Sequence, residues 1–324
     1  MKPQRRALIV GVSGQDGAYL AELLLAKGYD VVGTSRDAGS TRFDGLARLG
    51  IRERVTRVSM APNDFRSVLV VLDRFRPDEV YNLAGQSSVG LSFEQPVETL
   101  ESVAVSTLTL LEAIRFTRSS VRFYNAGSGE CYGDTGERPA TEETPFRPRS
   151  PYAVAKATSF WEVANYREAY GLFACTGVLY NHESPLRPER FVTQKIVAAA
   201  CRIAGGSGER LQLGNLDVRR DWGWAPEYVD AMWRMLQQET PRDLLVATGE
   251  TRSLAEFLAL AFEAVGLDWR EHVDHDPALR RPTDLHGGRA DPTRAREVLG
   301  WSASVRAPEV VRRMVEARRA AGPA

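Results

Sequence analysis

The sequence contains few of the residues that build disulfide frameworks, metal sites or membrane spans. Only three cysteines occur in 324 residues, far apart at Cys131, Cys175 and Cys201, so neither a disulfide framework nor a zinc site is indicated and a reducing cytoplasm is the expected location. The proline-flanked "HVDHD" segment at 272–276 is more typical of solvated residues than of metal ligands, so no metal is expected. The longer apolar runs, such as Tyr19–Leu25, are too short and interrupted to span a bilayer, and the N-terminus lacks a signal-peptide core. No membrane partner is expected.

Net charge is absent as well, because 42 basic and 42 acidic residues cancel. This balance argues against the positive field of a nucleic-acid-binding protein, so no nucleic-acid partner is expected. Lysine is scarce, since nearly all basic residues are arginine and lysine occurs only at Lys2, Lys27, Lys156 and Lys195. A lysine in such a chain indicates a place where a compact ammonium group is needed.

Strand-like and helix-like segments alternate in the N-terminal part of the chain. Strands are predicted at 7–11, 31–34, 54–58, 79–84 and 122–126, with helices at 65–75 and 103–117. Such alternation predicts an α/β fold with a Rossmann-type, doubly wound parallel sheet. After residue 180 the pattern loosens, and helices are predicted at 193–203, 226–237, 253–265 and 307–320. We therefore expect a Rossmann domain over 1–180, its sheet completed by segments near 210–250, and a smaller mixed substrate-binding portion over 181–324.

A glycine-rich turn separates the first predicted strand from the first helix. In "GVSGQDG", Gly11, Gly14 and Gly17 allow a tight turn and a close approach of a pyrophosphate, which the helix N-terminus also favours. Gln15 and Asp16 belong to the same turn. The pattern and its place predict that these five residues bind a dinucleotide cofactor, with a purely structural turn as the alternative.

The residues after the second predicted strand bear on which dinucleotide is bound. NAD-binding proteins place an acidic group there for the ribose 2′-OH, whereas this chain has Ser35 followed by Arg36. An arginine holds a 2′-phosphate with two hydrogen bonds, so NADP is favoured over NAD. Asp37 weakens this interpretation, and a solvated loop is the alternative.

The segment "SPYAVAK" contains Tyr152 and Lys156 at the spacing that puts both side chains on one face of a helix. A lysine so placed lowers the phenol pKa by its charge and holds the nicotinamide ribose, which would make the tyrosine an acid and base near neutral pH. The pattern alone is common on protein surfaces. It gains weight here because it follows a glycine-rich turn and uses one of only four lysines.

With these residues in place, the chain resembles the extended short-chain dehydrogenase/reductases that act on nucleotide sugars. Within that group it is similar to the GDP-mannose 4,6-dehydratase family over roughly residues 5–301. The segments that carry the likeness are "GVSGQDGAYLAELLLAKGY", "EVYNLAGQSSVGLSFEQP", "TPFRPRSPYAVAK", "NHESPLR", "FVTQKI", "LGNLDVRRDWGWAPEYVDAMW" and "ATGE". "NHESPLR" and "GNLDVRRDWG" are the most specific, because sibling epimerases and reductases have other residues there.

The resemblance implies a redox-neutral hydro-lyase that acts on a GDP-sugar. A tyrosine would deprotonate the sugar 4-OH while hydride leaves C4 for NADP⁺; a glutamate would then remove the C5 proton, water would leave C6, and hydride would return to C6. The alternatives are an NADPH-dependent reductase or epimerase of a 4-keto sugar nucleotide, a dehydratase of another sugar nucleotide such as a heptose, and a catalytically silent homologue.

The segment "NAGSGECYG" supplies the residues that would distinguish a lyase from a reductase. The resemblance puts the family's hydroxyl residue at Ser128 and its glutamate at Glu130, and Tyr152 and Lys156 complete the implied catalytic set. The family usually has threonine and serine where this chain has Ser128 and Gly129. Serine keeps the hydroxyl that would contact the 4-oxygen, so the function can survive. A plain glycine turn with an exposed glutamate is the alternative.

The resemblance implies further binding residues. Those for the cofactor lie at the end of the fourth strand, directly after it, or in "NHESPLR": Leu83, Ala84, Gln86, Ser87, His182 and Arg187. Those for the substrate are Ser88 and Asn181 near the sugar, and Lys195, Asn215, Arg220 and Arg281 at positions that hold the diphosphate. Each of these could instead be an ordinary surface or capping residue.

The chain departs from the family in two loops. Alanine and proline stand at 61–62 in place of an aspartate that helps to bind adenine, and a doubled arginine is reduced to Arg36 and a later Arg42. Because that arginine loop crosses a subunit interface in relatives, a homodimer is expected more than a tetramer. The helices near 103–116 and 152–170 correspond to those that pair into a four-helix bundle in the family.

Overall fold

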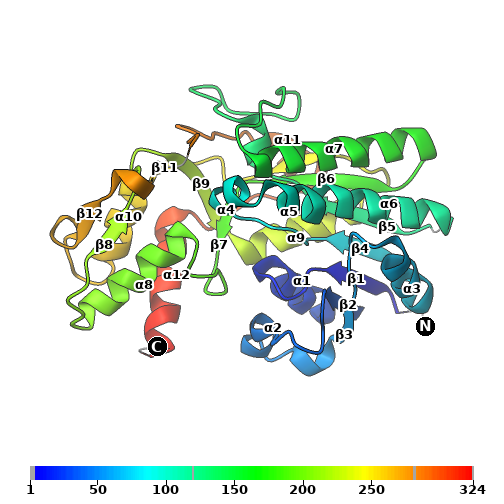
Figure 1. The fold of residues 1–324 in the computed structure, drawn as a ribbon, viewed down its shortest axis with the longest axis horizontal. Coiled ribbons are helices and arrows are strands. Elements are labelled where there is room, and N and C mark those ends of the chain that lie inside the picture. The colour runs from blue at the N-terminus through cyan, green and yellow to red at the C-terminus, as the bar shows by residue number, and fades with distance from the viewer. Residues whose placement is uncertain (1–3, 119, 280–281, 323–324) are drawn as a thin grey trace.

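The computed structural model describes residues 4–118, 120–279 and 282–322. Its centre is a seven-stranded parallel sheet of order β10-β6-β5-β4-β1-β2-β3 (Figure 1). The strands are β1 (Arg6–Val10), β2 (Asp30–Ser35), β3 (Thr56–Ser59), β4 (Glu79–Asn82), β5 (Arg122–Ala126), β6 (Ala174–Leu179) and β10 (Leu244–Val246). The strand order reverses between β1 and β4, and at such a point a parallel sheet opens a crevice beyond the carboxyl ends of its strands.

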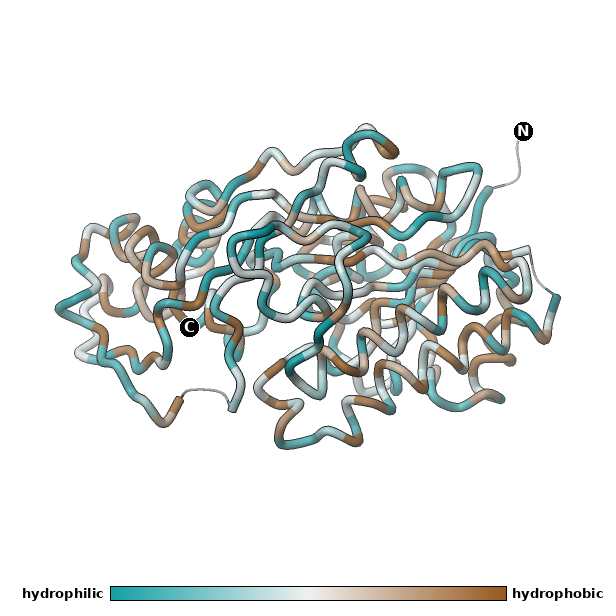
Figure 2. Tube along the Cα trace, turned by 90° about the horizontal axis from the view of Figure 1, so that it is seen from above, coloured by the Kyte–Doolittle hydropathy of each residue, from teal (hydrophilic) through white to brown (hydrophobic). Residues whose placement is uncertain are grey.

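Amphipathic helices cover both faces of this sheet. One face carries α1 (Gln15–Ala26), α9 (Ala225–Leu236) and α11 (Thr293–Leu299); the other carries α3 (Phe65–Phe75), α6 (Ser106–Phe116) and α7 (Pro151–Tyr170). Short helices α4 (Val89–Glu94) and α5 (Pro96–Leu100) and a π-helical turn (Glu101–Val105) lead into α6. Hydrophobic and hydrophilic stretches alternate along the helices in Figure 2, as expected for helices that pack one side on a sheet.

The predicted doubly wound sheet is confirmed, with small shifts at its boundaries. β3 begins at Thr56 and not at residue 54, because Arg52–Arg54 form a short 3₁₀ turn. β10 joins the sheet beside β6 after a long excursion of the chain, as expected from the segments near 210–250.

A smaller part of the molecule lies beyond the carboxyl ends of the strands. It contains α8 (Val192–Ala204), α10 (Leu254–Glu263), α12 (Ala307–Ala320) and two small sheets, whose strands are β7 (Asn181–Glu183), β9 (Arg219–Trp224), β11 (Thr251–Ser253), β8 (Leu211–Leu213) and β12 (Val273–His275). The three helices pack on one another around a core that includes Trp222, Phe257 and Phe262. This part therefore has a hydrophobic core of its own beside the sheet (Figure 1).

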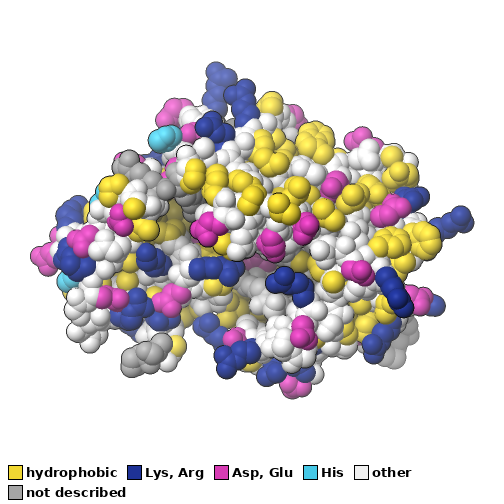
Figure 3. All heavy atoms as spheres, viewed as in Figure 1, with side chains coloured by type: hydrophobic (Ala, Val, Ile, Leu, Met, Phe, Trp, Pro, Cys, Tyr) yellow, Lys and Arg dark blue, Asp and Glu magenta, His cyan; other side chains and the backbone are white. Residues whose placement is uncertain are grey.

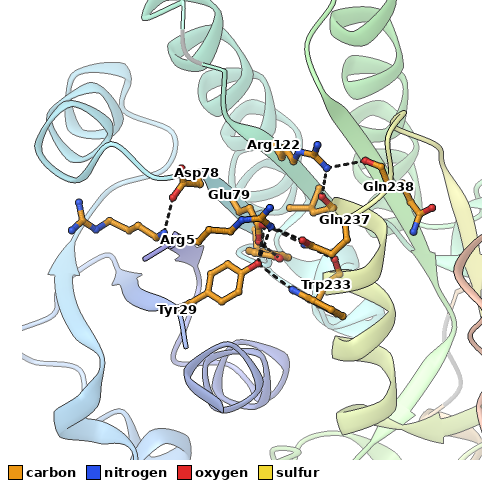
Figure 4. Close-up of polar contacts among 11 residues, drawn as sticks. Arg5, Tyr29, Asp78, Glu79, Arg122, Trp233, Gln237 and Gln238 are labelled. Carbon is orange, nitrogen blue, oxygen red and sulfur yellow. Dashed lines mark hydrogen bonds and ion pairs between the residues drawn. The ribbon is translucent and has the colours of Figure 1, made fainter. Parts of the chain in front are cut away.

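A buried carboxylate organises the amino ends of the central strands. Glu79 is 1% exposed and accepts hydrogen bonds from Tyr81 Oη (2.7 Å), Tyr29 Oη (3.0 Å), Gln237 Nε2 (3.1 Å) and Arg5 Nη1 (3.3 Å). Several donors compensate the loss of water around this charge. The contacts join the residues before β1 and β2 to β4 and to the residue after α9 (Figure 4), whereas the cleft that contains the glycine-rich turn lies beyond the opposite, carboxyl ends of the strands.

All three cysteines are free thiols, and Cys131 and Cys175 are buried. Within the ranges given above, no group of three or more His, Cys, Asp or Glu side chains is placed to hold a metal ion. None of the described helices combines the length and apolar character that crossing a membrane requires.

Candidate active site

A cleft of about 1140 Å³ runs from the glycine-rich turn across the strand ends to the smaller part. Its lining includes every sequence-predicted site residue that the structure describes. From the sheet side these are Gly11, Gly14, Gln15, Asp16, Gly17, Arg36, Leu83, Ala84, Gln86, Ser87, Ser88, Ser128, Glu130, Tyr152 and Lys156; from later segments they are Asn181, His182, Arg187, Lys195, Asn215 and Arg220. Arg281 lies outside the described residues.

The glycine-rich turn forms a cradle for an anion. Gly11 has φ +90°, and a Cβ there would lie 3.0 Å from the backbone of Ala84, while one at Gly17 would lie 2.5 Å from the Gly11 carbonyl oxygen. Helix α1 begins after Gly14, and no side chain caps its N-terminus. The first-turn N–H groups and the helix dipole therefore face the cleft without a competing side chain, which fits a dinucleotide pyrophosphate.

Two polar side chains of this turn bind the segment that contains β7. The Asp16 carboxylate lies 2.8 Å from Nε2 of His182, and Gln15 donates to the His182 carbonyl (3.2 Å) and accepts from the Ser184 hydroxyl (2.7 Å). Burial alone would raise the pKa of Asp16 and lower that of His182, but their mutual attraction outweighs it, so the pKa of Asp16 is lowered and that of His182 raised. The contact between Asp16 and His182 thus holds the glycine-rich turn against the segment that contains β7, and both segments line the cleft.

The turn after β2 leaves its arginine exposed and engages its aspartate. The Asp37 carboxylate accepts backbone hydrogen bonds from Gly39 (2.9 Å) and Ser40 (3.3 Å). These contacts, with the Ser40 hydroxyl contributing most, lower the pKa of Asp37. Arg36 is exposed and lines the cleft beside it. The Asp37 carboxylate, which weakened the NADP interpretation, is therefore hydrogen-bonded within its own turn.

Ser128 and Glu130 follow β5 on a short 3₁₀ helix, Gly129–Tyr132. The Ser128 hydroxyl accepts a hydrogen bond from the Glu130 backbone N–H (3.3 Å). Packing accounts for the glycine at the family's serine position, because a Cβ at Gly129 would lie 2.8 Å from the Tyr180 ring. Likewise, a Cβ at Gly127 would lie 2.7 Å from the Thr176 side chain. These two glycines let the end of β5 pack closely against β6 and Tyr180.

Tyr152 and Lys156 lie on the first turns of α7, which Ser150 caps by accepting a hydrogen bond from the Ala153 N–H (3.1 Å). Both are 8% exposed, and Lys156 Nζ donates to the Ala126 carbonyl at 2.6 Å. The expectation that the lysine lowers the phenol pKa is not what the structure shows. Burial raises the pKa of Tyr152, and a hydrogen bond with Ser128 offsets only part of this effect. Burial also lowers the pKa of Lys156 to about 8.

The far end of the cleft is basic. Lys195 Nζ donates to the Gln212 carbonyl (2.8 Å), and Arg187 lies over the Phe191 ring with its Cζ 3.7 Å from the centroid. Arg220 Nε lies 3.4 Å from Oε1 of Glu130. Cationic side chains from the loop after β7, from α8 and from β9 thus line the cleft.

Gln86 and Ser88, which were predicted to contact the cofactor and the sugar, form hydrogen bonds that stabilise the loop after β4. Gln86 Nε2 donates to the Ser88 carbonyl (2.9 Å) and to Thr99 Oγ1 (3.0 Å), and the Ser88 hydroxyl caps α4 by accepting from the Leu91 N–H (3.3 Å). The sequence analysis did not identify Leu285 and Gly288, which line the cleft. The segment that contains them, 285–288, also donates backbone hydrogen bonds to the Asp134 carboxylate. Nothing in the local sequence pattern around 285–288 signals this placement.

Comparisons with known proteins agree over nearly the whole chain. A family model described as GDP-mannose 4,6 dehydratase matches residues 8–314. GDP-mannose 4,6 dehydratase 1 of Arabidopsis thaliana is 45% identical, with 98% of this chain and 90% of the relative covered. GDP-mannose 4,6-dehydratase of Sinorhizobium fredii (strain HH103) is also 45% identical, with 93% of each covered. Among solved structures, UDP-glucose 4-epimerase of Thermus thermophilus in complex with NAD has a TM-score of 0.86 at 27% identity, with 98% of this chain and 99% of that chain covered.

Proposed function

Since the chain belongs to the GDP-mannose 4,6-dehydratase family, we propose that it converts GDP-mannose into the GDP-linked 4-keto-6-deoxy sugar by a redox-neutral loss of water. The observation that carries this proposal is the placement of Glu130 in one cleft with Ser128, Tyr152 and Lys156. A reductase has no need of a carboxylate beside the tyrosine, whereas a dehydratase requires one to remove the C5 proton.

Each side chain has a role that its environment supports. Tyr152, once ionised in the complex with substrate and cofactor, would take the proton of the sugar 4-OH, with Ser128 hydrogen-bonded to the same oxygen. Glu130 would remove the C5 proton, made acidic by the 4-ketone, and protonate the departing 6-hydroxyl. A bound nicotinamide cofactor supplies a hydride acceptor at C4 and the hydride for C6. The glycine-rich turn and Lys156 would hold it.

Incubation of the purified protein with GDP-mannose and no added reductant tests the function. We expect a 4-keto-6-deoxy product, identified by mass spectrometry and NMR, without net consumption or production of NADPH. Parallel incubations with UDP- and dTDP-hexoses test the guanine preference. A product that forms only with stoichiometric NADPH oxidation would identify a reductase and refute the proposal.

The nicotinamide cofactor is proposed to be NADP, because Arg36 is exposed toward the cleft and the Asp37 carboxylate is engaged in its own turn. Replacing Arg36→Ala removes a charge-assisted contact of about 1.5–3 kcal/mol, so the KM for NADP should rise about 10- to 100-fold. Initial rates at varied NADP and NAD measure this effect. The exposed Arg242→Ala, outside the cleft, is the matched control. An equal loss with NAD, or no loss with NADP, would contradict the assignment.

We propose that residues 1–180 bind the cofactor and that residues 181–324 mainly bind the GDP-sugar. Lys195 and Asn215 line the cleft from the smaller part, where a diphosphate would meet basic groups. Free thiols, two of them buried, suit a reducing compartment, and we propose the cytoplasm. Cell fractionation tests this location.

The assembly is proposed to be a homodimer formed through α6 and α7. This face exposes large apolar side chains, including Phe116 (65%) and Trp161 (63%), and Figure 3 shows hydrophobic atoms gathered over α5, α6 and α7. A Trp161→Glu change would bury a charge in such an interface, so we expect a monomer by light scattering at micromolar concentration. Val70→Glu, at an exposed position on α3, is the control. An unchanged dimer in Trp161→Glu would refute this interface.

A further inference from the structure

Arg220 contacts the carboxylate that the proposed reaction uses as its base. The side chains of Arg220 and Glu130 are 11% and 16% exposed, and their nearest atoms, Nε and Oε1, are 3.4 Å apart. The sequence assigned Arg220 only to the substrate diphosphate. We infer that Arg220 is a positioning residue that orients the Glu130 carboxylate for proton transfer at C5 and C6; this inference rests on the proposed function.

The guanidinium is itself fixed by the backbone. Arg220 Nη1 donates to the carbonyls of Arg219 and Leu285, both at 2.9 Å. The first carbonyl belongs to β9 and the second to the segment 285–288, which lines the cleft. Because the guanidinium is planar and rigid, two bonds at one end fix the direction of Nε at the other. The cation is therefore held at one place beside the carboxylate.

Glu130 is fixed from its other side by the catalytic serine. Its backbone N–H donates to the Ser128 hydroxyl, which is also hydrogen-bonded with Tyr152. This contact sets the backbone of Glu130 but leaves its side-chain torsions free. Among the described contacts, Arg220 is the basic side chain paired with that carboxylate. Loss of Arg220 would release the carboxylate, and a displacement of about 1 Å costs on the order of 100-fold in rate.

The step concerned uses the carboxylate twice. The C5–H bond breaks and its proton passes to Glu130, while the electron pair forms the C5=C6 double bond. The C6–O bond breaks, and the hydroxyl leaves as water with a proton that Glu130 returns. No electrons enter or leave in this step. The preceding oxidation at C4 depends on Tyr152, so a misplaced Glu130 should impair elimination and spare that oxidation.

The test uses the full-length enzyme with Arg220→Met and Arg220→Lys. With GDP-mannose, Arg220→Met should form product about 100-fold more slowly, while NADPH absorbance rises in the first turnover and persists. Rates are compared at saturating GDP-mannose, and calorimetry with GDP alone measures the loss of diphosphate binding separately, because Arg220 is also expected at the diphosphate. Arg220→Lys should form product about 10-fold faster than Arg220→Met, because an ammonium restores the charge but not the planar geometry of the guanidinium.

Arg219→Met is the matched control, since Arg219 is on the same strand and contacts Glu256 at 3.6 Å; it should keep rate and affinity. Thermal unfolding verifies the fold, and Arg220→Lys serves as the test if the methionine variant does not fold. A GDP affinity that falls in parallel with the rate, without NADPH accumulation, would make Arg220 a diphosphate ligand only. An unchanged rate would also overturn the inference. Failure of the wild type to dehydrate GDP-mannose would instead refute the proposed function.

Discussion

Replacing Glu130→Gln should abolish dehydration while the enzyme still exchanges hydride with its cofactor. The amide matches the carboxylate in shape but cannot accept the C5 proton, and general base catalysis of this kind contributes up to about 10⁴-fold. We expect product formation to fall by at least about 10³-fold. In rapid-mixing experiments NADPH absorbance should appear in the first turnover and persist, because oxidation at C4 does not use Glu130.

Two measurements complete the Glu130 experiment. In D₂O the wild type should incorporate deuterium at C5, and the glutamine variant should not. Glu137→Gln is the control, because Glu137 is 91% exposed on a neighbouring loop and should retain full activity. Retained activity in Glu130→Gln, or loss of NADPH formation together with product, would remove Glu130 from its assigned role.

Local patterns indicated the glycine-rich turn and the Tyr152–Lys156 pair, and the family resemblance indicated Ser128 and Glu130; each lies at the end of a strand or on the first turn of a helix. The glycine-rich turn, "GSGE" and the Tyr152–Lys156 pair combine a short spacing with a fixed place in a Rossmann sheet. A parallel sheet brings the carboxyl ends of its strands to one edge. The cleft therefore contains every predicted site residue that the structure describes.

Contacts between distant segments could not be predicted in this way. Asp16 and His182 both belong to motifs that the sequence assigned to the cofactor, yet their side chains bind each other across 166 residues. Arg220 meets Glu130 because β9 runs past the 3₁₀ helix, which no spacing in the chain encodes. Each motif indicated a ligand contact, whereas the fold gives some of these side chains a partner within the protein.

The pKa of Tyr152 shows a second limit of sequence reasoning. The spacing to Lys156 suggests a lowered phenol pKa, since a nearby cation favours the phenolate. The depth at which α7 is buried cannot be read from that spacing, and burial disfavours both the phenolate and the ammonium. Tyr152 therefore begins as a neutral phenol, and its ionisation depends on groups that the substrate and cofactor bring to it.

Tyr152→Phe should block the reaction before any hydride moves. The change removes one oxygen and keeps a ring that is 8% exposed, so the fold should be retained. Without a proton acceptor at the sugar 4-OH, we expect at least about 10³-fold slower turnover. In contrast to Glu130→Gln, no NADPH absorbance should appear, because no ketone forms; deuterium should be absent from C5, as it is in that variant. Tyr132→Phe, at a buried tyrosine that does not line the cleft, is the control.

The double variant Tyr152→Phe with Glu130→Gln tests the order of the steps. If oxidation at C4 precedes proton removal at C5, the double variant should behave as Tyr152→Phe does, with no NADPH in the first turnover. Persistent NADPH in the double variant would mean that another group deprotonates the 4-OH. The same would follow from NADPH formation in Tyr152→Phe alone, because the buried ring retains nothing that can accept a proton. Tyr152 then could not be the base, and Ser128, hydrogen-bonded with it, would be the next residue to replace.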